Sequence, residues 1–142
     1  LSHSGKKAEA LLYAVRSTEL RRKLLAAEPK DARMQNRLVF ALNLEAFLRG
    51  QLGQNPAAKL LFTESYRFAS ALVAADPARP DGQKNLLEAA SALFVLGGPC
   101  DIVPAARSAF KAIEARKLFN KFDQEHIDTL EKTLRQRTCP GL

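Results

Sequence analysis

Amide and aromatic side chains recur on one face of a segment with helical composition. Asn36, Phe40, Asn43 and Phe47 stand at i, i+4, i+7 and i+11, and this spacing places them in one stripe along an α-helix. Asparagine amides can hydrogen-bond the backbone of an extended peptide, and phenylalanine rings can accept an apolar side chain. The stripe predicts a peptide-binding surface. The alternative is that both phenylalanines are ordinary core residues between helices.

Basic residues stand near the starts of two expected helices. Arg33, Arg37 and Lys84 could pair with a carboxylate of a ligand through charge-assisted hydrogen bonds. The alternative is that all three are solvated surface charges, which contribute little. These residues therefore extend the candidate site without fixing its ligand.

The residues that usually carry catalysis or bind metals are sparse. The two histidines are His3, near the N-terminus, and His126, which stands among acidic residues and is predicted to be a solvated surface residue. No phosphate-binding, dinucleotide-binding, serine-hydrolase or zinc-protease motif occurs. Cys100 and Cys139 are isolated and lack metal-ligand spacing, and a disulfide between them remains open. We expect no enzyme, no metal and no cofactor.

The elements that must position the stripe are helices. Alanine, leucine, lysine and arginine dominate the long segments, and no sustained alternation of apolar and polar residues indicates strands. Asp31 is predicted to cap the second helix, and Asn55 the third, with Pro56 at its first position. The pattern predicts an all-α protein of six helices, at about 6–27, 31–50, 55–75, 81–97, 101–119 and 123–138.

The chain contains an internal repeat. Residues 24–50 align without a gap to residues 72–98, an offset of 48 residues. Leucines and alanines contribute to the match, but proline, glutamine and glycine also recur at the corners, where geometry constrains the backbone. The nine identical pairs are Leu24/Leu72, Ala26/Ala74, Ala27/Ala75, Pro29/Pro77, Gln35/Gln83, Leu38/Leu86, Ala41/Ala89, Leu48/Leu96 and Gly50/Gly98. The repeat predicts a shared helix–turn–helix unit, with Leu38 and Leu86 in matching buried positions.

The joints of this repeat resemble those of bacterial tetratricopeptide-like arrays with long helices. Both joints end in Leu-x-Ala-Ala-acidic-Pro, and Ala58 followed by Phe62, like Ala106 followed by Phe110, is similar to the small-then-aromatic step of that family. The resemblance covers about residues 8–122. It implies a right-handed superhelical array of antiparallel helical hairpins, in which stacked neighbours bury a continuous core. The implied units are residues 8–29, 30–77 and 78–122, followed by a capping helix at 123–138.

The same resemblance places a concave groove along the first helix of each hairpin. It implies that the chain binds a peptide or a partner protein in this groove without catalysis. The repeat-equivalents of the stripe are Lys84, Glu88, Ser91 and Val95. The predicted peptide-binding residues are Asn36, Arg37, Phe40, Asn43, Phe47, Lys84 and Ser91.

The charge balance leaves two further functions open. The net charge is +7 and the isoelectric point about 9.7, and the Arg21-Arg22-Lys23 cluster raises nucleic-acid binding. No helix-turn-helix spacing and no interleaving of aromatic with basic residues supports it, so we expect a protein partner, acidic surfaces included. Self-association through an exposed repeat edge is the other alternative. No apolar stretch is long enough for a membrane span. We expect a cytoplasmic module of a longer protein.

Overall fold

The chain folds into helices alone over the residues that the structure describes. The computed structural model describes residues 3–142, which contain no strand. The all-α prediction is therefore confirmed for this range. The elements are α1 (His3–Ala27), α2 (Ala32–Gln51), α3 (Asn55–Ala75), α4 (Pro80–Val95), the 3₁₀ turn η1 (Cys100–Ile102), α5 (Val103–Ala115) and α6 (Lys121–Arg135).

Caps and prolines set most helix starts. The Asp31 carboxylate accepts a hydrogen bond from the Met34 N–H at 3.1 Å, so the predicted cap of α2 is confirmed. The prediction for Asn55 is wrong, because Asn55 is already helical and Gln54 occupies the cap position without a side-chain hydrogen bond. Helix α4 begins at Pro80, one residue before the predicted start, because the fixed φ of proline suits a first helical position.

The connection between α5 and α6 is longer than predicted. Helix α5 ends at Ala115 and not near Phe119, and the chain turns through Lys117, whose φ is +58°. Helix α6 begins at Lys121 because Asn120 and Asp123 form a reciprocal capping box, in which each side chain accepts from the other residue's N–H. The predicted start at Asp123 overlooked this cap.

The internal repeat has a structural counterpart. The Gln35 side chain donates to the Pro29 carbonyl at 2.7 Å, and the Gln83 side chain donates to the Pro77 carbonyl at 2.9 Å. Both bonds fasten the first turn of a helix to the proline corner before it. Leu38 and Leu86 are 2% and 5% exposed, which confirms the predicted matching burial. The turns before α2 and α4 are thus held by the same type of hydrogen bond.

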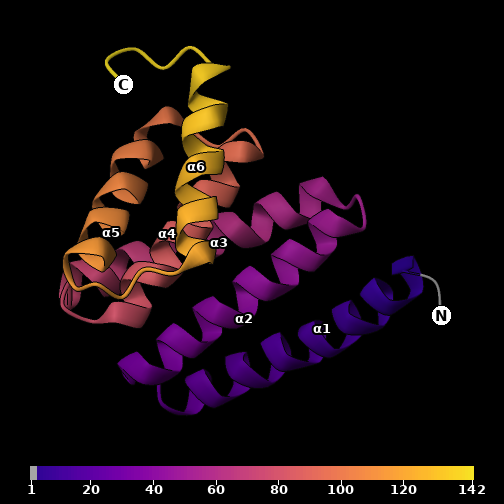
Figure 1. Cartoon of the computed structure of the whole chain (residues 1–142). Coiled ribbons are helices and arrows are strands. Elements are labelled where there is room, and N and C mark those ends of the chain that lie inside the picture. Colours follow the sequence, from indigo (N-terminus) through magenta and orange to yellow (C-terminus); the bar gives the residue numbers. More distant parts are fainter. Residues whose placement is uncertain (1–2) are drawn as a thin grey trace.

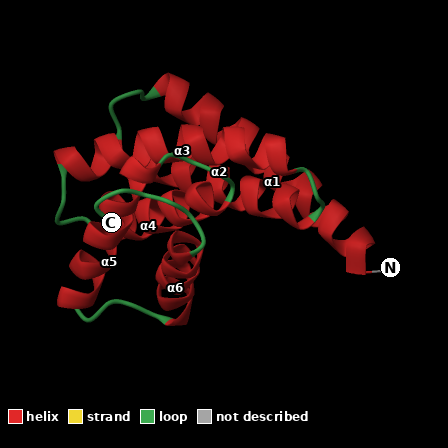
Figure 2. Ribbon diagram, turned by 90° about the horizontal axis from the view of Figure 1, so that it is seen from above, coloured by secondary structure: helices red, strands yellow, loops and turns green. Residues whose placement is uncertain are grey.

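The helices pack mainly on their neighbours along the chain, around α4. Figure 1 shows α1 and α2 side by side at one edge of the molecule, and α1 packs chiefly on α2. Helix α3 packs on both α2 and α4, while α5 and α6 both pack on α4. The first turns of α1 extend beyond the other helices in the perpendicular view (Figure 2). The central core is apolar and includes Val39, Phe62, Leu87, Phe94, Ile102, Ile113 and Leu130.

A disulfide closes the C-terminal end. Cys100 in η1 is bonded to Cys139, which lies beyond α6, with a Cα–Cα distance of 5.7 Å. The Arg137 guanidinium lies 4.1 Å from the centre of the Phe94 ring and donates to the Phe94 carbonyl at 3.1 Å. The tail after α6 is therefore fixed at two points, to η1 by the disulfide and to the end of α4 by Arg137.

Candidate functional site

A groove runs between α2, α4 and α6. It encloses about 400 Å³, which is within the range of small ligand sites. Small side chains leave this space open, because Ala46, Gly50 and Ala58 stand where larger residues would fill it. The remaining lining comes from α2, α3, α4 and α6: Phe47, Gln51, Asn55, Phe62, Glu88, Ser91, Ala92, Val95, Leu96, His126 and Thr129.

Two apolar side chains in the groove are open to solvent. Phe47 is 53% exposed and Val95 is 44% exposed. They come from matching positions of the repeat, because residue 95 is 48 residues after residue 47. Covering such side chains with an apolar group stabilises a complex by about 25 cal/mol for each Å² removed from water. The groove therefore offers a place for an apolar anchor of a ligand.

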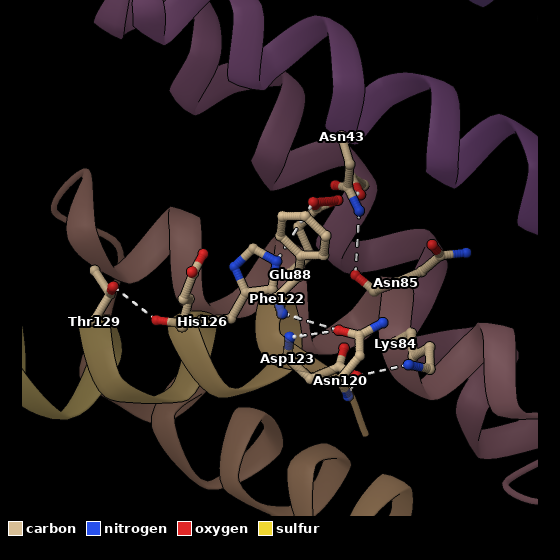
Figure 3. A network of polar contacts seen from close by, with 11 residues as sticks. Asn43, Lys84, Asn85, Glu88, Asn120, Phe122, Asp123, His126 and Thr129 are labelled. Atoms are coloured by element: carbon tan, nitrogen blue, oxygen red, sulfur yellow. Dashed lines mark hydrogen bonds and ion pairs between the residues drawn. The ribbon is translucent and has the colours of Figure 1, made fainter. Parts of the chain in front are cut away.

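One wall of the groove carries a carboxyl and an imidazole. The Glu88 Oε2 of α4 lies 3.7 Å from the His126 Nε2 of α6, and both side chains are half-buried. Figure 3 shows the two side chains side by side between the helices. The prediction that His126 is a solvated surface residue is wrong, because α6 lies along α4 and brings this face of α6 against it.

Burial shifts both groups toward their neutral forms. Burial raises the pKa of the Glu88 carboxyl, a hydrogen bond from the Asn43 side chain lowers it, and the Asp123 carboxylate raises it again. Burial lowers the pKa of the His126 imidazole, although the carboxylates of Asp123 and Glu125 act in the opposite direction. His126 is therefore mainly neutral near pH 7. The wall presents hydrogen-bonding groups in a partly dehydrated setting, where a hydrogen bond to a polar group is stronger than in water.

A hydroxyl without a hydrogen-bond partner among the described residues lies at the floor of the groove. Ser91 is buried, lines the groove, and its hydroxyl oxygen has no hydrogen-bond partner within the described chain. Its oxygen is closed to solvent, so a ligand could reach it only if the side chains that line the groove moved. Ser91 and Phe47 are the two predicted site residues that this groove brings together.

Lys84 serves the attachment of α6. Its ammonium lies 2.6 Å from the Asp123 Oδ2, and Asp123 is buried. The same Asp123 accepts from the Asn120 N–H at 2.9 Å, while the Asn120 side chain accepts from the N–H groups of Phe122 and Asp123 (Figure 3). The ion pair and the capping box together hold the first turn of α6 on α4. Lys84 is thus engaged inside the protein and not free for a ligand carboxylate.

Asn43 lies between helices and not on the groove surface. Its side chain is 0% exposed. The amide nitrogen donates to the Asn85 carbonyl of α4 at 3.2 Å, and the amide oxygen accepts from the Ser65 hydroxyl of α3. Asn85 in turn donates to the Asn36 carbonyl at 3.3 Å. The predicted contact of Asn43 with a peptide is therefore corrected: in this conformation no part of its side chain can be reached by a ligand.

The other predicted residues line a separate hollow. Asn36, Arg37 and Phe40 border a space of about 270 Å³ between α1, α2 and α4. Asn36 is buried and its amide oxygen has no hydrogen-bond partner in the described part of the chain, while Phe40 is exposed. Residues four apart on a helix diverge by about 40° around its axis. The amides of the stripe therefore point into the contact between α2 and α4, while the phenylalanine rings are exposed to solvent.

Replacing Asn43 by alanine should destabilise the fold. Asn43→Ala removes the side-chain hydrogen bonds to the Asn85 carbonyl and the Glu88 carboxyl, and leaves the buried Ser65 hydroxyl without its acceptor. We expect the free energy of unfolding to fall by about 1–3 kcal/mol, measured by urea titration. The matched control is Asn55→Ala, an exposed position, which should change it by less than about 0.5 kcal/mol. An Asn43→Ala variant as stable as the parent would show that the hydrogen bonds of Asn43 with α3 and α4 do not contribute to stability.

The described residues hold no further cluster that marks a reaction. Within residues 3–142, no three His, Cys, Asp or Glu side chains gather as ligands for a metal ion. Comparison of the chain with family models, with curated proteins and with solved structures found no match. The geometry of the groove is therefore the basis for a functional conclusion.

Proposed function

We propose that this chain is a non-catalytic protein-interaction module, which binds a peptide segment of a partner protein in the groove between α2, α4 and α6. The observation that carries the proposal is a pair of exposed apolar side chains, Phe47 and Val95, beside the carboxyl–imidazole wall of the same groove. Apolar pockets with a few placed polar groups are typical of binding sites. Catalysis has less support, because His126 makes no hydrogen bond to a hydroxyl or thiol among the described residues.

The proposed ligand is an extended segment with one apolar anchor. The anchor would lie between Phe47 and Val95, and a backbone or side-chain N–H of the ligand would donate to Glu88. A ligand carboxylate beside Glu88 would be unfavourable, because both groups are acidic.

The arrangement as a tetratricopeptide-like superhelix is part of the same proposal. Two observations support it. The proline turns before α2 and α4 are held by the same type of hydrogen bond, and α3 packs on both α2 and α4. In such an array α2, α4 and α6 would form the inner layer. The groove lies on these three helices, where the resemblance expects a concave surface.

The cellular compartment is proposed from the disulfide. The cytoplasm was the expectation from the sequence, but disulfides persist mainly in oxidising compartments. The bond between Cys100 and Cys139 leaves no free cysteine in the described chain, and it favours an extracytoplasmic location. No helix within residues 3–142 has the length and apolar character that crossing a membrane requires.

A change at Phe47 should test the groove. A displayed library of random dodecapeptides is selected on the folded chain, and the selected peptides are then measured by isothermal titration calorimetry. Phe47→Asp should weaken their binding by about tenfold or more, because it removes the apolar anchor site and adds a charge. The control Leu60→Asp changes an exposed residue of α3 outside the groove and should leave binding unchanged. Peptides that bind both variants equally well would refute the groove as the site.

A further inference from the structure

Helix α1 has an apolar face that its repeat-equivalent buries. In α3, Ser65 donates to Asn43 of α2, so this side of α3 faces α2. Leu61, Phe68 and Leu72 lie at −4, +3 and +7 from Ser65, on the same side of the helix, and all three pack against the core. The α2-facing side of α3 is thus an apolar stripe centred on a serine.

The repeat offset of 48 residues relates this stripe of α3 to a stripe on α1. Subtracting 48 places Tyr13, Ser17, Leu20 and Leu24 at the positions of Leu61, Ser65, Phe68 and Leu72. The serine and the last leucine are identical in the two stripes. On α1, however, Tyr13 is 61% exposed, Leu20 is 54% exposed and Leu24 is 39% exposed. Helix α1 packs chiefly on α2, and within residues 3–142 no helix covers α1 as α2 covers α3.

Basic side chains flank the open stripe. Residues 3–27 carry Lys6, Lys7, Arg16, Arg21, Arg22 and Lys23 against Glu9 and Glu19. Arg22 is paired with Glu64 of α3, but Arg21 and Lys23, which border the stripe, form no ion pair among the described residues. A second copy would bring an equally basic α1 to the same place, and like charges oppose that contact. The charge on the stripe favours an acidic occupant.

We propose that Tyr13, Ser17, Leu20 and Leu24 form a docking site for an amphipathic helix of a partner protein, with acidic residues beside its apolar face. The helix lies on α1 as α2 lies on α3. Its apolar face covers the three large side chains, a polar side chain equivalent to Asn43 accepts from Ser17, and its carboxylates pair with Arg21 and Lys23. This site is separate from the groove and does not depend on the proposed function.

The test uses a peptide derived from the helix that covers the equivalent stripe. A fluorescein-labelled peptide of residues 31–52, carrying Arg33→Glu, Arg37→Glu and Arg49→Glu, is titrated with the folded chain and followed by anisotropy. We expect saturable binding that weakens as salt is added. The unmodified basic peptide should bind about tenfold more weakly or worse.

Two variants locate the binding. Leu20→Glu places a charge in the stripe at an exposed position, so the fold is kept, and the affinity should fall by about tenfold or more. Leu60→Glu is the matched control on an exposed position of α3 and should leave the affinity unchanged. Absence of saturable binding at about 1 mM peptide, or equal binding to the Leu20→Glu variant, would overturn the proposal. A dimer of the free chain that Leu20→Glu dissociates would also overturn it, because the occupant would then be a second copy.

Discussion

Removing the bond between Cys100 and Cys139 should lower the free energy of unfolding by roughly 3–4 kcal/mol. The two cysteines are 39 residues apart, so the bond restricts a large loop of the unfolded chain, and the loss of that restriction accounts for most of the effect. The loop contains all of α5 and α6. The measurement is a urea titration of the double variant Cys100→Ser/Cys139→Ser beside the parent protein.

The reducing agent provides the control for this prediction. Dithiothreitol should lower the stability of the parent protein toward that of the double variant and leave the variant itself unchanged. The helical circular dichroism of the variant should persist without denaturant, because the ion pairs of Lys84 with Asp123 and of Arg107 with Glu131 still hold α6 on its neighbours. Equal stability of the oxidised and reduced parent protein would show that the bond does not form in solution.

The disulfide also shows where sequence reasoning ends. Two cysteines 39 residues apart carry no local signal of pairing, since the contact depends on how the tail after α6 returns to η1. Predictions that depend on local sequence patterns were more accurate. Helix periodicity predicted six helices, and the cap at Asp31 and the buried pair Leu38 and Leu86 are confirmed.

Only part of the candidate site was predicted, because the rest also depends on contacts between helices that are distant along the chain. Asparagine on a helix face was interpreted as ligand-binding, but Asn43 satisfies backbone and side-chain groups of two neighbouring helices. Its burial follows from the packing of α2 on α3 and α4, which no spacing within α2 reveals. Glu88 and His126 meet across α4 and α6, 38 positions apart. A signal for Glu88 existed nevertheless, because the repeat alignment places Glu88, Ser91 and Val95 on one stripe of α4.

Replacing Leu38 or Leu86 by alanine tests the repeat. The two leucines are identical in the alignment and almost fully buried. Truncating a buried leucine removes apolar contacts and leaves a cavity, and the expected loss of unfolding free energy is about 2–5 kcal/mol for each. Leu86 belongs to the central core, while Leu38 does not. We therefore expect Leu86→Ala to be near the upper end of this range and Leu38→Ala near the lower end.

The two leucines differ in the packing around them. Leu86 belongs to a core to which α2, α3, α4, α5 and α6 all contribute, whereas Leu38 is buried outside that core. Urea titration of both variants, with the exposed Leu12→Ala as control, measures the two losses under the same conditions. The control should change stability by less than about 0.5 kcal/mol. If either buried leucine behaves like the control, the two joints do not enclose equivalent packing, and the repeat is a similarity of sequence alone.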